Sequence, residues 1–334
     1  MQPLQDAVDG AAERSGFSGV VRVDRAGSPE LCTAYGLADR AHVVPTTVDT
    51  VFATASGAKT LTALVVMRLV ERGTLELGTT ARSLLGDDLR LVADDVTVEH
   101  LLAHRSGIGD YLDEDLVDDI LDYVMPVPVH ELATTEQFVA VLDGHDTVFP
   151  AGTRFAYNNA GYVLLALLAE RATGTAYHDL VRTLVCEPAG MVDTAFLRSD
   201  ELPGRAALGY LFRDGLRTNV LHLPVRGTGA GGVYSTAADL SAFWEALYAG
   251  RIVSSASLAE MVRPRSDWPE ESRRYGLGFH LQATGDAVWL EGYDAGVSFK
   301  SMHQRTSSLT CTVISNWTDG AWPIVGLLRE RFAI

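Results

Sequence analysis

The apolar residues of this chain recur with two periods, and the period changes along the sequence. Short alternating or continuous apolar runs bounded by turn residues predict strands, whereas spacings of three and four residues predict helices with one buried face. Residues 2–15 have the pattern of an amphipathic helix. The segments "SGVVRVDRAG" (18–27) and "ELCTAYGLAD" (30–39) then indicate two strands joined by a glycine-containing turn.

The middle of the chain is predicted to be mainly helical. Residues 56–72 carry apolar side chains at a helical spacing, and Gly73 follows them as a natural helix stop. The residues with this spacing are Leu61, Leu64, Val65 and Leu69. Four further helices are predicted over 96–104, 134–143, 158–172 and 175–186.

From residue 205 onwards the pattern typical of strands returns. Residues 205–215 and 215–223 are predicted to be strands, residues 236–250 a helix, and residues 319–333 a closing helix. Four short apolar segments between these helices predict an antiparallel meander. These segments are "RRYGLGFHLQ" (273–282), "AVWLEGY" (287–293), "GVSFKSMH" (296–303) and "SLTCTVISN" (308–316).

Strands at both ends of the chain with helices between them predict an α+β fold. The 334 residues suit one large domain or two interleaved ones. One antiparallel sheet domain would be built from residues 1–60 and 205–334, with a mainly helical domain, residues 61–204, inserted into it. The active site is expected in the cleft between the two parts.

Composition narrows the range of partners. The chain is 47% hydrophobic and 21% charged, and its formal net charge is −16. This is the balance of a globular protein, and its acidity argues against nucleic acid or an anionic membrane as a partner. The apolar run "GYVLLALLA" (161–169) is too short to insert across a bilayer. The sequence gives no indication of the oligomeric state.

Two features favour a cytoplasmic location. The first residues lack the basic start and apolar run of a signal peptide. The three cysteines, Cys32, Cys186 and Cys311, are odd in number and widely spaced, which suggests buried thiols in a reducing compartment. A mature chain trimmed of an export signal would look similar, although the starting methionine counts against it.

Lysine is almost absent from the chain, since Lys59 and Lys300 are the only two among 27 basic residues. Lys59 follows Ser56 by three residues, so the two side chains would share one face of a helix. Arginine stays charged in proteins, whereas a buried lysine can lose its proton and act as a base. The S-x-x-K spacing therefore fits a Ser–Lys pair for nucleophilic catalysis, but it also fits a capping serine and a solvated lysine.

Further segments favour the catalytic interpretation. "FPAGTRFAYNNAGYVLLALLAERATG" (149–174) carries a Tyr-Asn-Asn sequence just before an apolar helix, and "LLAHRSGIGDY" (101–111) precedes it. With "AGGVYSTAADLSAF" (230–243) and "YGLGFHL" (275–281), this order of segments resembles the serine β-lactamase and penicillin-binding-protein family. The likeness is to its branch of class C β-lactamases, D-alanyl-D-alanine carboxypeptidases and esterases, and it runs from about residue 17 to the end.

The resemblance implies a β-lactamase/transpeptidase-like α+β fold and hydrolysis through an acyl-enzyme, with no cofactor. Ser56 would be the nucleophile and Lys59 its activating partner. Tyr157 would be the phenol or phenolate that carries the proton to the leaving group, and a neighbouring cation would favour the phenolate. Asn159 would bind the substrate amide and help to hold Lys59, although it could also be an ordinary helix N-cap.

The third motif of the family departs from its usual pattern in this chain. The family carries a Lys- or His-Thr-Gly triplet on an edge strand, and the matching stretch here is "WLEGYDAGVSF" (289–299). This match places Leu290 at the cationic position, Glu291 at the threonine position and Gly292 at the glycine position. The backbone N–H of Tyr293 would then be the second oxyanion donor, beside the N–H of the nucleophile.

The altered triplet changes the expected substrate. In carboxypeptidases and β-lactamases the triplet holds a substrate carboxylate, which a leucine cannot bind and a glutamate would repel. The sequence therefore predicts a small ester, amide or other acyl substrate without that carboxylate. One alternative is a true β-lactamase or D,D-peptidase in which Arg226, Arg273 or Arg305 replaces the cation. Another is a penicillin-binding or ligand-sensing homologue with little turnover.

The remaining polar candidates have simpler explanations. His100 and His104 could share a helix face as metal ligands, but no third ligand is near in sequence, so packing or loop anchoring is expected and no metal. The acidic run "DEDLVDD" (113–119) is expected to be a solvated loop or helix face. Tyr111, directly after the "SGIGD" turn, is expected to line the cleft.

Overall fold

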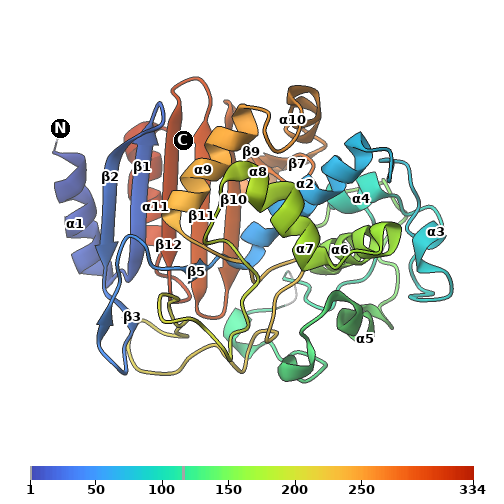
Figure 1. Ribbon diagram of the computed structural model, residues 1–334, viewed down its shortest axis with the longest axis horizontal. Helices are drawn as coiled ribbons and strands as arrows, with labels where there is room; N and C mark the ends of the chain where they lie inside the picture. Colours follow the sequence, from blue (N-terminus) through green and yellow to red (C-terminus); the bar gives the residue numbers. More distant parts are fainter. Residues whose placement is uncertain (1, 115–116) are drawn as a thin grey trace.

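The computed structural model describes residues 2–114 and 117–334 (Figure 1). Its α-helices are α1 (Leu4–Ser15), α2 (Ala58–Glu71), α3 (Arg82–Leu85), α4 (Val98–Leu102), α5 (Val139–Leu142), α6 (Asn159–Thr173), α7 (Tyr177–Val181), α8 (Glu187–Ala189), α9 (Ala237–Tyr248), α10 (Ser255–Met261) and α11 (Trp322–Phe332). Its strands are β1 (Gly19–Arg25), β2 (Ser28–Tyr35), β3 (Leu37–Asp39), β4 (Val44–Pro45), β5 (Phe52–Ala53), β6 (Tyr234–Ser235), β7 (Ser266–Trp268), β8 (Arg273–Tyr275), β9 (His280–Gln282), β10 (Ala287–Asp294), β11 (Val297–Gln304) and β12 (Leu309–Ser315). Two 3₁₀ turns matter below, η1 (Ala55–Gly57) and η4 (Thr135–Phe138).

One eight-stranded sheet joins the two ends of the chain. Its strand order is β2-β1-β12-β11-β10-β9-β8-β7, and every neighbouring pair is antiparallel. In Figure 1, α9 crosses the front of this sheet and α11 lies behind it. The α+β class and the antiparallel meander predicted from the sequence are thereby confirmed.

Side chains that alternate along the strands enter two separate cores. On β1, Val21 and Val23 pack with α1 and α11, whereas Val20 faces the helices from the middle of the chain. Helices α2 and α6 are apolar on nearly all sides, and both are buried over most of their length. The first turns of α2 and α6 are thereby held rigidly, and the candidate catalytic residues lie in these turns or next to them.

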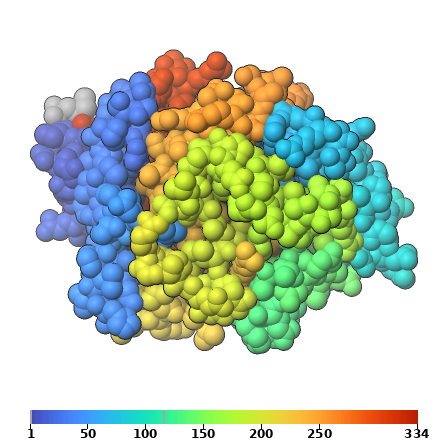
Figure 2. Space-filling view, in the orientation of Figure 1, coloured from blue at the N-terminus to red at the C-terminus, as the bar shows by residue number. Residues whose placement is uncertain are grey.

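Two predicted strands are wrong. Residues 205–215 and 215–223 form turns and bends, with isolated bridges from Ala206 to Val51 and from Tyr210 to Thr218 and Trp317. Tyr210 donates its N–H to the carbonyl of Asn316 just after β12, and Ala207 and Leu208 donate theirs to the carbonyls of Val51 and Ala38. Other backbone groups bond within the segment, so no ladder is needed to satisfy them. In Figure 2 the surrounding segment, coloured yellow, runs over the surface between the blue N-terminal strands and the green segments.

The helical region is shorter in regular structure than predicted. The predicted helix over 96–104 is limited to α4, and the one over 134–143 begins as the 3₁₀ turn η4 before it becomes α5. The division into two domains remains a prediction. In the part of the chain that the structure describes, no helix is both long and apolar enough to cross a bilayer.

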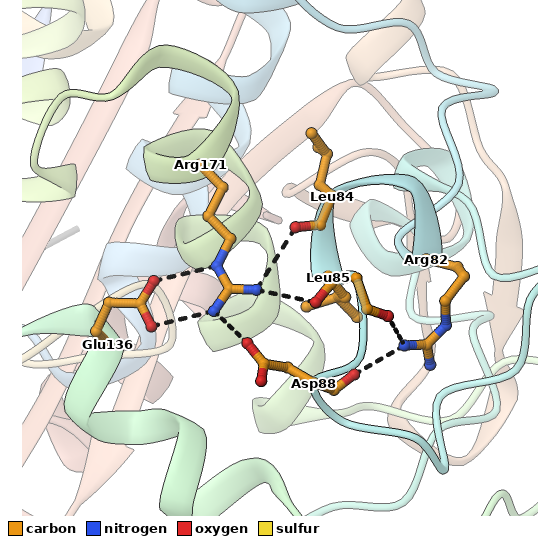
Figure 3. A network of polar contacts seen from close by, with 7 residues as sticks. Arg82, Leu84, Leu85, Asp88, Glu136 and Arg171 are labelled. Carbon is orange, nitrogen blue, oxygen red and sulfur yellow. Dashed lines mark hydrogen bonds and ion pairs between the residues drawn. The ribbon is translucent and has the colours of Figure 1, made fainter.

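One arginine ties three segments of the helical region together (Figure 3). Arg171, in the last turn of α6, donates from Nε and Nη2 to Glu136 of η4 at 3.1 Å each and from Nη2 to Asp88 at 2.7 Å. Its Nη1 donates to the carbonyls of Leu84 and Leu85 at the end of α3. Paired N–H bonds from a guanidinium to a carboxylate fix orientation as well as distance, so this cluster holds α6 in place.

Candidate active site

Ser56 and Lys59 lie in successive turns at the start of α2, with Ser56 in η1. The Nζ of Lys59 lies 2.8 Å from Ser56 Oγ, 2.8 Å from Asn159 Oδ1 and 2.9 Å from the carbonyl oxygen of Ala230. A neutral amine has two N–H bonds and one lone pair. When Asn159 and Ala230 accept the two N–H bonds, the lone pair is left facing the Ser56 hydroxyl, which is the geometry of a general base.

The surroundings of Lys59 favour its neutral form. Its side chain is only 2% exposed. Burial lowers the pKa of Lys59 to about 8, although the carboxylates of Glu114, Asp110 and Asp294 act in the opposite direction. With a pKa near 8, about a tenth of the molecules carry a neutral Lys59 at pH 7.

Tyr157 lies beside this pair as a neutral phenol. The Lys59 Nζ is 4.9 Å from the centre of its ring. Burial raises the pKa of Tyr157 well above its ordinary value, the negative charge of Glu114 adds to this, and a hydrogen bond with Ser56 opposes it. Of the two forms expected for Tyr157, burial therefore favours the phenol, because the loss of solvent outweighs any stabilisation by a nearby cation.

His104 holds the loop that carries Tyr157. Its Nδ1 accepts a hydrogen bond from the N–H of Asn158 at 3.0 Å, and its ring packs against Tyr157 with centroids 4.4 Å apart. Burial lowers the pKa of His104, which keeps the imidazole neutral and Nδ1 able to accept. His100 instead completes a capping box with Thr97 at the start of α4. Within residues 2–114 and 117–334, no group of three or more His, Cys, Asp or Glu side chains is arranged to hold a metal.

Asn159 uses both ends of its side-chain amide. Its Oδ1 accepts from Lys59, and its Nδ2 donates to the Leu112 carbonyl and to Glu114 Oε1, both at 3.0 Å. The N-cap of α6 is Asn158, so Asn159 is not the capping residue. The carboxylate of Asp110 accepts the N–H groups of Asn159 and Ala160.

Strand β10 brings the altered triplet against the nucleophile through Gly292. A Cβ at this position would lie 2.1 Å from the Thr54 carbonyl oxygen and 2.9 Å from the Ser56 nitrogen. Only glycine allows this approach of two backbones. Leu290 is buried in the core, and Tyr293 is 41% exposed. The role of the Tyr293 N–H as second oxyanion donor stays a prediction.

Glu291 points to the opposite face of β10, where two cations balance the charge of its carboxylate. Its carboxylate lies 2.7 Å from Lys300 Nζ and 2.8 Å from Arg273 Nη1. Burial alone would raise the pKa of Glu291, but Lys300, His280 and Arg273 together hold it well below its usual range. The expected repulsion of a substrate carboxylate by a bare glutamate is therefore wrong.

Of the three arginines proposed as a replacement cation, Arg273 is the one bonded to the triplet, through Glu291. Arg226 donates to the Phe196 carbonyl, and Arg305 lines a separate cavity.

A cavity opens beside Ser56, and carboxylates form part of its wall. Its lining includes Tyr111, as the sequence predicts, together with Asn159, Glu114 and Asp294. Glu114 belongs to the acidic run that was expected to be solvated, yet it turns towards Asn159 and this cavity. Asp115 of the same run lies outside the described residues.

The eight-stranded antiparallel sheet and the helices that cover it define a class of proteins, the serine hydrolases of the β-lactamase fold. The model of the Beta-lactamase family matches residues 4–321, and the chain belongs to this family of serine hydrolases.

Individual relatives agree with this assignment. The chain is 30% identical to penicillin-binding protein 4* of Bacillus subtilis, over 88% of this chain and 66% of that protein. It is 31% identical to esterase EstB of Burkholderia gladioli, over 82% of this chain and 77% of the esterase. The solved structure of a penicillin-binding protein from Bacillus halodurans has a TM-score of 0.90 and 32% identity, and covers 97% of this chain and 99% of its own. The chain thus spans about two thirds of the length of the Bacillus subtilis relative.

Proposed function

We propose that this protein hydrolyses an ester or amide bond through an acyl-enzyme formed on Ser56. The observation that carries the proposal is the 2.8 Å contact between Ser56 Oγ and the Nζ of Lys59, a lysine whose pKa burial lowers to about 8. Neutral Lys59 takes the proton of Ser56 as the oxygen attacks the substrate carbonyl. The oxyanion is stabilised by the N–H of Ser56 and by that of Tyr293.

Tyr157 supplies the proton to the leaving group. Its phenol is neutral and hydrogen-bonded to Ser56, so it can pass a proton to the departing oxygen or nitrogen and be reprotonated from Lys59. A water molecule then attacks the acyl-enzyme with the same pair as base, and this step regenerates Ser56.

The substrate expected from the triplet is one without the carboxylate that β-lactams and D,D-peptides carry. Leu290 offers no charge, and the cations near Glu291 are already bonded to that carboxylate. The similarity to an esterase supports this choice. Similarity to penicillin-binding proteins supports a second candidate, a D,D-peptidase, β-lactamase or low-turnover penicillin-binding homologue.

One experiment tests the nucleophile. Wild type and Ser56→Ala are treated with a fluorophosphonate probe and mapped by peptide mass spectrometry, and both are assayed on a p-nitrophenyl ester. We expect labelling of Ser56 alone and loss of both labelling and hydrolysis in the variant. Labelling of another residue, or an active variant, would overturn the proposal. Stable labelling of Ser56 by penicillin without release of product would instead support the low-turnover candidate.

A further inference from the structure

The cavity beside Ser56 lies on the acyl side of the bond to be cleaved, if the proposed function is correct. Tyr157, the proton donor to the leaving group, does not line this cavity and packs instead against Trp268. A proton donor must face the atom that it protonates. The leaving group therefore lies towards Tyr157, and the cavity, which Tyr157 does not line, receives the acyl part of the substrate.

Strand geometry directs Asp294 into this cavity. Side chains alternate along β10, so Gly292 and Asp294 share the face that lies against Ser56. Two residues of strand separate their Cα atoms by about 6 to 7 Å. Gly292 lies against the backbone at Ser56. Asp294, two residues further along β10, lines the same cavity as Ser56. Its Oδ1 accepts the N–H of Ala295.

Glu114 faces the same space from the segment that follows α4. It accepts from the side-chain amide of Asn159, which in turn contacts Lys59. Burial, with a smaller contribution from the negative charge of Glu114, raises the pKa of Asp294 to about 7. Among the described residues that line the cavity, none is lysine, arginine or histidine. Lys59 is the cation that acts electrostatically on both carboxylates, and it is neutral when it serves as the base. Two carboxylates in a confined space beside a neutral lysine favour a ligand that brings a positive charge.

We infer that the acyl part of the substrate carries a positively charged ammonium group, which Asp294 and Glu114 bind. The inference rests on the proposed function and specifies its substrate class as aminoacyl esters or amides with a free amino group. The acyl carbonyl would sit between the N–H groups of Ser56 and Tyr293. The ammonium would then reach the Asp294 carboxylate at the wall.

The test compares substrates that differ only in the ammonium group. Wild type, Asp294→Asn and Glu114→Gln are assayed on D- and L-alanine methyl ester and on methyl propionate, by measuring the acid released. Glu13→Gln, on α1, serves as the control for loss of one distant carboxylate. The quantity compared is the ratio of kcat/KM for the better alanine ester to that for methyl propionate.

We expect a wild-type ratio of roughly ten or more, since a charge-assisted hydrogen bond is worth at least that factor. Asp294→Asn should lower the ratio about tenfold, Glu114→Gln should lower it in the same direction, and Glu13→Gln should leave it as in wild type. An unchanged ratio in Asp294→Asn would overturn the inference, because a carboxylate that only shifts the pKa of Lys59 changes kcat/KM for both substrates by the same factor.

The outcome also separates this inference from the proposed function. If wild type has the same kcat/KM for methyl propionate as for either alanine ester, while Ser56→Ala is inactive, the inference is overturned. The assignment of Ser56 as the nucleophile would then still stand. A Ser56→Ala variant that keeps its activity on every ester would overturn both.

Discussion

The two lysines of this chain are both buried, but they lie in opposite electrostatic surroundings. Lys59 is 2% exposed and Lys300 is 8% exposed, and burial lowers the pKa of each. Lys59 contacts only uncharged oxygens, from a hydroxyl, an amide and a carbonyl. Lys300 contacts the carboxylate of Glu291 at 2.7 Å and lies 4.2 Å from the centre of the Trp289 ring.

The contrast shows that burial alone does not make a lysine a base. A carboxylate in direct contact keeps the Lys300 pair ionised, whereas the uncharged partners of Lys59 leave it free to lose its proton. The two environments lie on opposite faces of β10, with Glu291 on one face and Gly292 on the other.

Replacing each lysine by arginine should give the largest difference. Lys59→Arg keeps a charged guanidinium beside Ser56, which cannot accept a proton, so kcat/KM on a p-nitrophenyl ester should fall by about a thousandfold. Lys300→Arg retains a cation for Glu291 and should stay within about threefold of wild type. Equal losses in the two variants would contradict the comparison. Thermal unfolding of both variants separates loss of chemistry from loss of fold.

Breaking the ion pair on the other face should mainly cost stability. Glu291→Gln leaves Lys300 and Arg273 without their shared carboxylate, and we expect the free energy of unfolding to drop by about 2 kcal/mol. This loss is smaller than that for a fully buried ion pair, because the Glu291 side chain keeps some contact with solvent. Urea unfolding measures the change. The double variant Glu291→Leu/Lys300→Met should be more stable than Glu291→Gln, since it leaves no lysine ammonium unpaired. A double variant less stable than the single one would refute this account.

The pH dependence of kcat/KM should also distinguish the two lysines, with a smaller effect than the substitutions above. Only neutral Lys59 can accept the Ser56 proton, so kcat/KM on an uncharged ester should rise as pH passes through about 8, by roughly tenfold between pH 7 and pH 9. Asp294 raises the pKa of Lys59, so Asp294→Asn should move this rise to lower pH. Lys300→Arg should leave it in place. A profile that is flat over this range, or falls, would exclude Lys59 as the base.

Much of the fold could be predicted because its elements have clear apolar periods. The hairpin of β1 and β2, the buried helices α2 and α6, and the meander that ends in β12 all follow from local patterns. Residues 205–223 have the apolar character of strands, yet they bond to Val51, Ala38 and Asn316 at single points and form no ladder, and pairing is not encoded locally.

Only part of the candidate active site could be predicted from the sequence. The positions of Ser56, Lys59 and Tyr157 follow from motifs, but Glu114 lies in a segment without any period, so nothing in the sequence indicates that it turns inwards. The pairing of Glu291 with Lys300 did leave a signal. The two residues lie symmetrically about the turn at Ala295 and Gly296, which places them opposite each other in the hairpin of β10 and β11.

The position of β1 beside β12 has a consequence for synthesis. The first strand of the sheet pairs with the last one, so during translation the N-terminal hairpin has to wait for nearly the whole chain before one edge of it is covered. Until then β1 presents unpaired backbone groups, and Val21 and Val23 lack the part of their core that β12 and α11 supply. During its synthesis this protein is therefore open to mispairing and chaperone binding at β1.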